Sequence, residues 1–480
     1  MKRAGLVLMM LLFCGVALGQ WSGYYGKGEG ELDGGLGMAW IDNQPYFSVS
    51  FMPDISIGKI GIGLNINLLV NTQTGKVRSA DWDSGYDYAR LIRYLRYAHK
   101  GDPFYARLGA LDATRLGHGF IVNYYNNQIN YDERKIGLAL DVDRGLFGFE
   151  TIASNLGRLE VAGIRAYVRP LYKSEMPILK NLGFGASYVT DADPDAWKKS
   201  EDGISLYGVD VELPLIKSTS FNTMLYADHA AVLDPPTETD MMTELLKLAG
   251  MSTVGDWDKE GAGSGQAIGI RMDFNALLSL VNLSAQFERR MLNKGFIPGY
   301  FGPFYEVLRY TSVGELLEFY EELGGNTDEI KDNAVLYNAI KGVPVRQKML
   351  LPLINQDRKG WFGGLTLDVL KFVRVLGTYQ LIDGQANSGL LHFGAGLSQD
   401  IPLVSFEATY DKIGMDKLKD VFKLDRRSVA RVGLGYKIKP YLLLYVDYIW
   451  NFVWDEDKGA YKPQERIQPR LALRYPLDLQ

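Results

Sequence analysis

Charged side chains that recur at every second position are the residues of this chain whose spacing indicates a function. Side chains two positions apart in an extended strand point to the same face, so such charges share one wall. If that wall meets water, opposed arginines and carboxylates on it select solutes by charge. The residues that we expect to line such a pore are Arg165, Arg169, Arg271, Asp273, Glu407, Arg431, Asp447, Arg466, Arg470 and Arg474. The same charges could instead pair with one another and brace the wall.

No pattern typical of catalysis or metal binding accompanies these charges. The four histidines are His99, His118, His229 and His392, and none belongs to a His-Glu-x-x-His motif. A Gly-x-Ser-x-Gly motif and a phosphate-binding loop are also absent from the sequence. His118 lies between two glycines, where a hydrogen-bonded histidine in a tight turn is the simpler interpretation than a catalytic base. We therefore expect no enzyme, no catalytic residue, no metal site and no cofactor.

Composition and the first residues place the chain outside the cytoplasm. With 480 residues, 47% hydrophobic and 23% charged, the chain is not disordered, and its net charge of -5 gives no reason to expect nucleic acid as a partner. Lys2 and Arg3 precede an apolar run from Leu6 to Leu18, and Ala17 and Gly19 fit a cleavage site. We expect residues 1–19 to be a signal peptide. The remaining residues 20–480 then contain no cysteine, because Cys14 is the only one.

Alternation of apolar and polar residues with a period of two predicts the fold. In the last strand, Leu471, Leu473 and Tyr475 alternate with Arg470 and Arg474, and many upstream segments repeat this pattern. The expected strands run about 10–12 residues, which suits a tilted membrane strand better than a soluble one. The joins between them alternate short and long, as in outer-membrane barrels. A propeller would repeat every 40–50 residues or so, and we find no such repeat. A soluble exported β-protein is the least favoured alternative.

The chain resembles bacterial outer-membrane β-barrel proteins of the porin-like kind over essentially all of residues 20–480. The resemblance rests on the signal peptide, the alternating strands and the aromatic-bearing last strand. One departure is that Pro476 to Gln480 follow Tyr475, so the usual terminal aromatic is absent. The alternating segments, together with the even strand counts of single-chain barrels, predict an all-β, single antiparallel transmembrane β-barrel of 16–20 strands. The resemblance implies that it lies in the bacterial outer membrane, with the outer-membrane lipid and the barrel assembly machinery as partners. Aromatic residues such as Trp450 and Phe452 are expected at the membrane interface.

Two long insertions, residues 232–263 and 291–358, are expected to be helical extracellular loops. We expect helices at Thr237 to Ala249, at Val313 to Leu323 behind a Ser312–Glu315 capping box, and at Asp328 to Ile340. A 68-residue connection with apolar helix faces must bury them, either by constricting the pore or by capping the rim.

These features predict a porin or channel that passes small polar solutes through a charged lumen. One alternative is a plugged transporter of hydrophobic molecules, which an apolar pocket beneath the 291–358 insertion would favour. The other is a non-conducting structural or adhesive scaffold, which a sealed lumen would favour. The sequence does not identify the solute.

Overall fold

The computed structural model describes residues 29–478, apart from positions 42–43, 84, 131–134, 177, 193–202, 236–260, 277–279, 310, 323–326, 342–343, 346–350, 353, 371, 386, 399–400 and 456–459. The predicted signal peptide and the helix expected at 237–249 lie outside the described residues.

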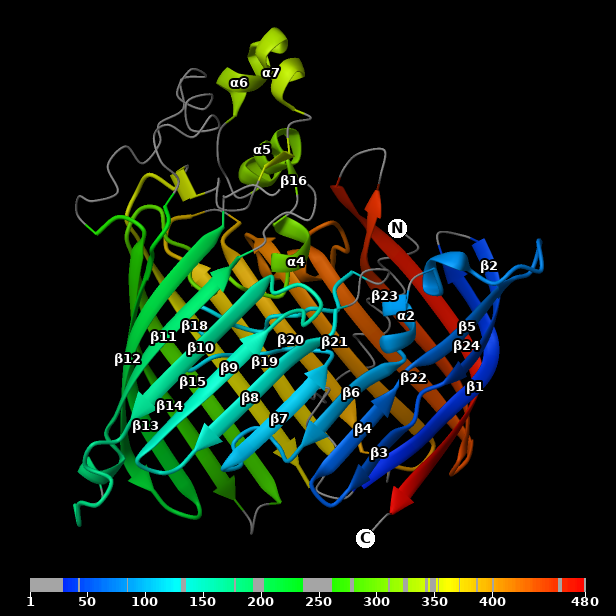
Figure 1. Cartoon of the computed structure of the whole chain (residues 1–480), viewed down its shortest axis with the longest axis horizontal. Helices are drawn as coiled ribbons and strands as arrows, with labels where there is room; N and C mark the ends of the chain where they lie inside the picture. Colours follow the sequence, from blue (N-terminus) through cyan, green and yellow to red (C-terminus); the bar gives the residue numbers. More distant parts are fainter. Residues whose placement is uncertain are drawn as a thin grey trace.

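One antiparallel sheet of 22 strands forms the body of the molecule and returns to its first strand (Figure 1). β1 (Glu29–Ile41) pairs with β2 (Gln44–Phe51) on one side and with β24 (Ala460–Asp478) on the other. The sheet is therefore a closed barrel, which leaves no edge strand open to pairing with another chain. The other strands of the barrel are β3 (Asp54–Ile57), β4 (Ile60–Leu64), β5 (Ile66–Asn71), β6 (Ile92–Tyr97), β7 (Phe104–Gly109), β8 (Gly137–Asp143), β9 (Phe147–Ala153), β10 (Val161–Val168), β11 (Gly183–Asp191), β12 (Ile204–Lys217), β13 (Phe221–Val232), β14 (Ser264–Ala276), β15 (Val281–Leu292), β18 (Arg358–Val369), β19 (Val373–Ile382), β20 (Gly389–Leu397), β21 (Val404–Met415), β22 (Ser428–Lys439) and β23 (Leu442–Asp455).

Two of the barrel strands are interrupted rather than continuous. β2 and β3 follow one another along β1, with a break at Met52 and Pro53, and β4 and β5 are separated only by Asn65. Proline has no N–H to donate to a neighbouring strand, which explains the first break. Counting each interrupted pair as one strand, the 22 described strands make a ring of 20. That number is even and lies within the predicted 16–20, so the fold prediction is confirmed.

The outer face of the barrel is apolar and the inner face is polar or tightly packed. On β24, Leu471, Leu473 and Tyr475 are exposed, whereas the intervening Arg470 and Arg474 are buried in the lumen. This is the alternation of a strand with lipid outside and polar groups inside. None of the described helices is long and apolar enough to cross a membrane.

The two ends of the barrel differ. Short turns, such as Pro440–Tyr441 between β22 and β23, lie at the end where the C-terminus is found, and helices rise above the opposite end (Figure 1). The helices are α2 (Gly85–Ala89), α4 (Tyr305–Leu308), α5 (Val313–Glu322), α6 (Asp328–Asp332) and α7 (Ala334–Ile340), with a small β16 (Thr311–Ser312) and β17 (Pro344–Val345) pair beside α5 and 3-10 turns η1 (Ser79–Asp81), η2 (Leu179–Asn181) and η4 (Leu418–Phe422).

The helix expected near 313–323 is confirmed as α5. The helix expected over 328–340 is divided into α6 and α7, because Asn333 caps α7 by accepting a hydrogen bond from the Leu336 backbone N–H.

In the described part of the chain, two connections fold into the lumen. The first inner segment, residues 110–130, follows β7, and the second inner segment, residues 293–309, follows β15 and includes α4. They touch one another through a parallel bridge between Val122 and Phe301, with the Asn123 N–H donating to the Phe301 carbonyl at 3.1 Å. From the sequence, an insertion into the pore is expected only for the second connection.

Phe452 is a correction to the sequence analysis, which placed it in the aromatic girdle at the membrane interface. Beyond Trp450, β23 no longer pairs with β22, and Phe452 instead forms a bridge with Asn130 of the first inner segment. Its ring is buried against Ile129 and Phe304. Phe452 thus packs against the inner segments, although the strand pattern alone assigns it to the membrane interface.

Candidate functional site: a lumen divided in two

The inner segments divide the lumen into two halves with different contents. The packed half is walled by β9 to β15 together with β19, and its inner-face residues form one apolar cluster with the inner segments. The polar half is walled by β1, β2, β5 to β8 and β20 to β24 and contains a cavity of about 440 Å³. A volume of this size holds on the order of ten water molecules.

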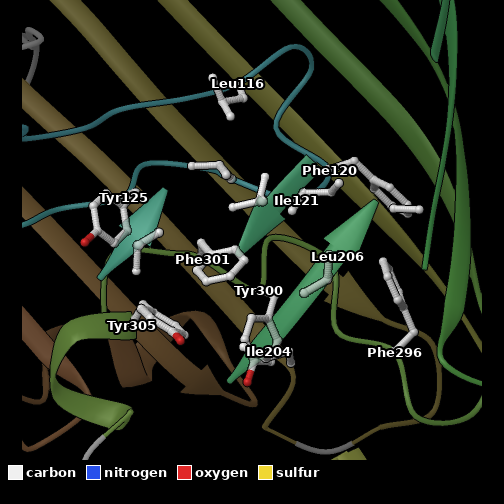
Figure 2. Close-up of a cluster of buried hydrophobic side chains, with 14 of the residues drawn as sticks. Leu116, Phe120, Ile121, Tyr125, Ile204, Leu206, Phe296, Tyr300, Phe301 and Tyr305 are labelled. Carbon is white, nitrogen blue, oxygen red and sulfur yellow. The ribbon is translucent and has the colours of Figure 1, made fainter. Parts of the chain in front are cut away.

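Apolar side chains fill the packed half. Phe301 lies at the centre of the cluster, near Tyr125 of the first inner segment and Leu206 of β12 (Figure 2). The rings of Phe301 and Tyr305 lie 4.7 Å apart in a tilted arrangement. The wall contributes Ile152, Val161, Val189, Ile204, Leu206, Ala230, Ala267, Leu292 and Ile382.

A buried charge cluster fastens α4 and the second inner segment to the wall of the packed half. Arg309 Nη2 lies 2.7 Å from Glu160 and its Nη1 lies 2.9 Å from Asp191. Lys135 pairs with both Glu160 and Glu306. Burial raises the pKa of Glu306, but the charges of Lys135 and Arg309 outweigh burial and hold it below its usual range. Two cations, Lys135 and Arg309, thus lie among the three carboxylates of Glu160, Asp191 and Glu306.

His118 fastens the first inner segment to the same half. Its Nδ1 lies 2.9 Å from Asp228, its Nε2 lies 3.4 Å from Glu212, and its ring stacks on Tyr226 at 4.0 Å. Burial lowers the pKa of His118, but the hydrogen bonds to the two carboxylates outweigh this effect and raise the pKa to about 9. Gly117 and Gly119 on either side have positive φ angles. The expected hydrogen-bonded turn histidine is confirmed.

The polar half presents mainly cations to its cavity. Among the described residues, eight lysines and arginines line it against three aspartates: Arg90, Arg93, Arg96, Lys100, Arg107, Lys135, Arg431 and Arg470 against Asp112, Asp411 and Asp447. Several counter-charges lie in the wall instead. Arg93 pairs with Asp54 at 2.5 Å and Lys100 with Asp141 at 2.8 Å, and neither carboxylate lines the cavity. A solute in the cavity therefore meets a surface on which positive groups predominate.

The first inner segment also touches the polar wall through Tyr124. The Tyr124 ring stacks on His392 of β20 at 3.8 Å, and His392 Nδ1 lies 2.7 Å from Asp411. This contact fixes the position of the partition between the two halves.

Charged residues from both ends of the chain meet where the barrel closes. Asp33 of β1 lies 2.5 Å from Arg470 and 2.9 Å from Arg474 of β24. Both guanidinium groups lie over the Tyr445 ring, at 4.8 and 4.7 Å from its centroid. Side chains thus reinforce the backbone ladder between the first and last strands.

The structure places the ten residues predicted to line a pore in several environments. Arg431, Asp447 and Arg470 line the polar cavity. Glu407 accepts a hydrogen bond from Tyr445, and Arg474 donates to Ser405, so both lie next to that group. Arg466 is fully buried nearby on β24 and donates to Gln464.

The other four predicted residues lie apart from this group. Arg165 is enclosed by Asp210, Glu150 and Glu212 on the packed side. Arg169 pairs with Asp143, and Arg271 pairs with Asp273 at 3.3 Å. Ion pairing within the wall is thus common to most of the set, and conduction past these residues stays a prediction.

Several residues of the polar cavity were missed by the sequence analysis. Arg93 and Arg96 lie on β6, a strand whose dense arginines and aromatics obscure the period-two alternation. The close spacing of these arginines in the sequence was the feature that could have identified the segment as part of a cation-lined cavity.

A second, smaller cavity of about 170 Å³ lies between the second inner segment and the ends of β18 to β21. Its lining is mainly apolar, with Arg358 at one side. Within the described parts of the chain, no group of three or more His, Cys, Asp or Glu side chains is arranged to hold a metal ion.

Comparisons with known proteins show a similarity in fold to solved structures, at low sequence identity. No protein-family model and no curated protein matches the chain. Among solved structures, the chain is similar to OccAB4 of Acinetobacter baumannii (11% identity, 94% of this chain and 98% of that chain, TM-score 0.28) and to the outer membrane protein OprD of Pseudomonas aeruginosa (8%, 97% and 98%, 0.28). It is also similar to CdiB of Acinetobacter baumannii (7% identity, TM-score 0.25), with 93% of this chain covered but only 60% of the length of CdiB.

Proposed function

We propose that this membrane-spanning barrel of the bacterial outer-membrane type is a channel for small polar solutes, and that it favours anions. Solutes pass by diffusion through the polar half, without a covalent step and without a cofactor. The observation that carries the proposal is the 440 Å³ cavity, whose lining holds eight lysines and arginines against three aspartates. A cavity with low-dielectric walls and charges mainly of one sign concentrates ions of the opposite sign.

Lys100 and Arg93 are suitable residues for testing the selectivity. Both line the cavity, and both remain partly exposed, at 49% and 32% of their side-chain surface. Their removal therefore alters the charge that a solute meets with less disturbance of the wall than removal of a fully buried arginine.

The test is the reversal potential of the purified barrel in a planar bilayer under a potassium chloride gradient. We expect an anion-selective current in the wild-type protein and a shift toward cations in the Arg93→Gln, Lys100→Gln double variant. Arg289→Gln is the matched control, because Arg289 stacks on Trp361 on the outer face and does not line the cavity. A cation-selective wild-type current would contradict the proposed selectivity. Absence of any current would contradict the channel and leave a plugged transporter of hydrophobic molecules, which the apolar cavity beneath the second inner segment favours, or a scaffold.

A further inference from the structure

The 170 Å³ cavity beneath the second inner segment combines an apolar lining with a single cation. Its apolar residues are Ile297, Pro298, Tyr300, Pro303, Phe304, Leu308, Ile354, Ile382, Leu390 and Ile413. A cavity of about 150 Å³ accepts a benzene ring, so this one has room for an apolar body of about six to eight carbon atoms. The cavity is separate from the polar one, with no lining residue in common.

Arg358, the first residue of β18, is the only cation among the described residues of this lining. It pairs across the ladder with Leu292, an inner-face residue that is buried, so its side chain starts from the inner face of the barrel. One terminal nitrogen donates to Gln385 at 3.0 Å, and the other donates to the Phe296 carbonyl. Its Nε is fully buried and has no hydrogen-bond partner.

No carboxylate of the described residues lies within ion-pair distance of Arg358, unlike Arg165, Arg309 and Arg470, each of which contacts at least two. Two acidic residues lie beside Arg358, one next to it in sequence and one across the ladder with β19, and both are engaged elsewhere. Asp357 accepts a hydrogen bond from the Lys294 backbone N–H, and Asp383 pairs with Arg289 at 2.7 Å. A partly buried guanidinium that contacts only neutral acceptors carries a desolvation cost that no counter-charge offsets. An anionic ligand would supply that counter-charge.

We propose that this cavity is a binding site for a small monocarboxylate with an apolar body, such as an aromatic or short aliphatic acid. The apolar part fills the space under the second inner segment, and the carboxylate accepts hydrogen bonds from Arg358, including one from Nε. A charge-assisted pair of this kind contributes directional affinity that a neutral molecule of the same shape lacks. The site does not depend on the polar half being a conducting path.

The test is isothermal titration calorimetry on the barrel purified in detergent, with benzoate, benzyl alcohol and acetate as probes. We expect benzoate to bind, and we expect benzyl alcohol and acetate to bind at least about tenfold more weakly. Benzyl alcohol lacks the carboxylate, and acetate lacks the apolar body. Arg358→Gln reduces benzoate affinity about tenfold or more, toward that of benzyl alcohol. Lys331→Gln, on α6 and in the lining of neither cavity, leaves benzoate affinity unchanged.

A second variant keeps the test decisive if Arg358→Gln does not give the heat-modifiable gel mobility of a folded barrel. Leu390→Trp fills the cavity while keeping Arg358, and we expect it to abolish benzoate binding. Benzoate binding no tighter than that of benzyl alcohol would overturn the proposal. Unchanged benzoate affinity in a folded Arg358→Gln or Leu390→Trp variant would place the anion elsewhere and overturn it as well.

Discussion

The two halves of the lumen are built from the same kind of strand but differ in what their inner faces hold. In the packed half the inward positions are apolar, as at Val189 and Leu206, and the inner segments cover them. In the polar half the corresponding positions are small or polar, as at Ser48 and Asn67, and a cavity remains. The comparison teaches that the inward residues of a barrel strand decide whether a connection packs against it or leaves room for water.

The halves also differ in how their charges are used. On the packed side, Arg309 and His118 are enclosed with carboxylates and fasten the inner segments to the wall. On the polar side, Lys100 keeps about half of its side-chain surface exposed and lines the cavity. The charges of Arg309 and His118 are thus structural, whereas that of Lys100 is available to a solute.

The largest expected effect is on stability, from breaking the buried cluster of the packed half. Arg309→Ala leaves the fully buried Asp191 and Glu160 without this cation, and we expect a loss of about 3–5 kcal/mol in the free energy of unfolding. Urea unfolding of the folded barrel, followed by tryptophan fluorescence, measures it. Lys331→Ala removes the exposed pair with Glu321 on the outer helices, and we expect at most about 1 kcal/mol. Similar losses in the two variants would contradict the anchoring role of Arg309.

A pH-dependent effect of up to about 3 kcal/mol is expected from His118, which lies in the first inner segment. Its pKa is raised to about 9 in the folded chain, from an ordinary value of 6.5. The stabilisation is therefore fully present below about pH 6.5 and is lost as the pH rises through 9. The measurement is the difference in unfolding free energy between the wild type and His118→Gln across pH 6 to 10. If the difference in unfolding free energy stays constant over this range, His118 is not held in its charged form by Asp228 and Glu212.

A smaller difference is expected between two glycines with similar backbone angles. Gly117 (φ +53°) lies against Arg165, and an added Cβ would stand 2.9 Å from the Arg165 Cδ, whereas Gly58 (φ +58°) has nothing within 4 Å. Gly58→Ala carries only the cost of the left-handed conformation, about 1 kcal/mol, and we expect about 2–3 kcal/mol for Gly117→Ala. Urea unfolding of the two variants side by side checks this. Equal losses of unfolding free energy in the two variants would mean that the Arg165 side chain moves aside without a measurable cost.

The alternation of the strands was predictable from sequence because it is local. Leu471, Leu473 and Tyr475 face outward for the reason that their spacing indicated, namely that side chains two apart share a face. The partition of the lumen was not predictable in the same way. Val122 and Phe301 bridge residues that are far apart in the chain, and the first inner segment has no period that marks it as buried.

In the candidate site too, the strand positions of the residues could be predicted from the sequence, whereas their long-range partners could not. Arg431, Asp447 and Arg470 were assigned to the lumen from their strand positions, and they line the cavity. The partner of Arg470 was not foreseeable, since Asp33 is 437 positions away and meets it only because the barrel closes there. Likewise, that no carboxylate of the described residues pairs with Arg358 becomes visible only when all neighbouring strands are in place.

The most direct test of the divided lumen uses the scarcity of cysteine in this chain. Cys14 is the only one, so a chain that starts at Gln20 has none, and single cysteines can be placed at Ala430 in the polar cavity and at Ala230 in the packed half. The measurement is bilayer current before and after addition of a charged, water-soluble thiol reagent. The divided lumen predicts that the reagent reduces the current of Ala430→Cys and leaves that of Ala230→Cys unchanged. A reduced current in Ala230→Cys, or an unaffected current in Ala430→Cys, would contradict it.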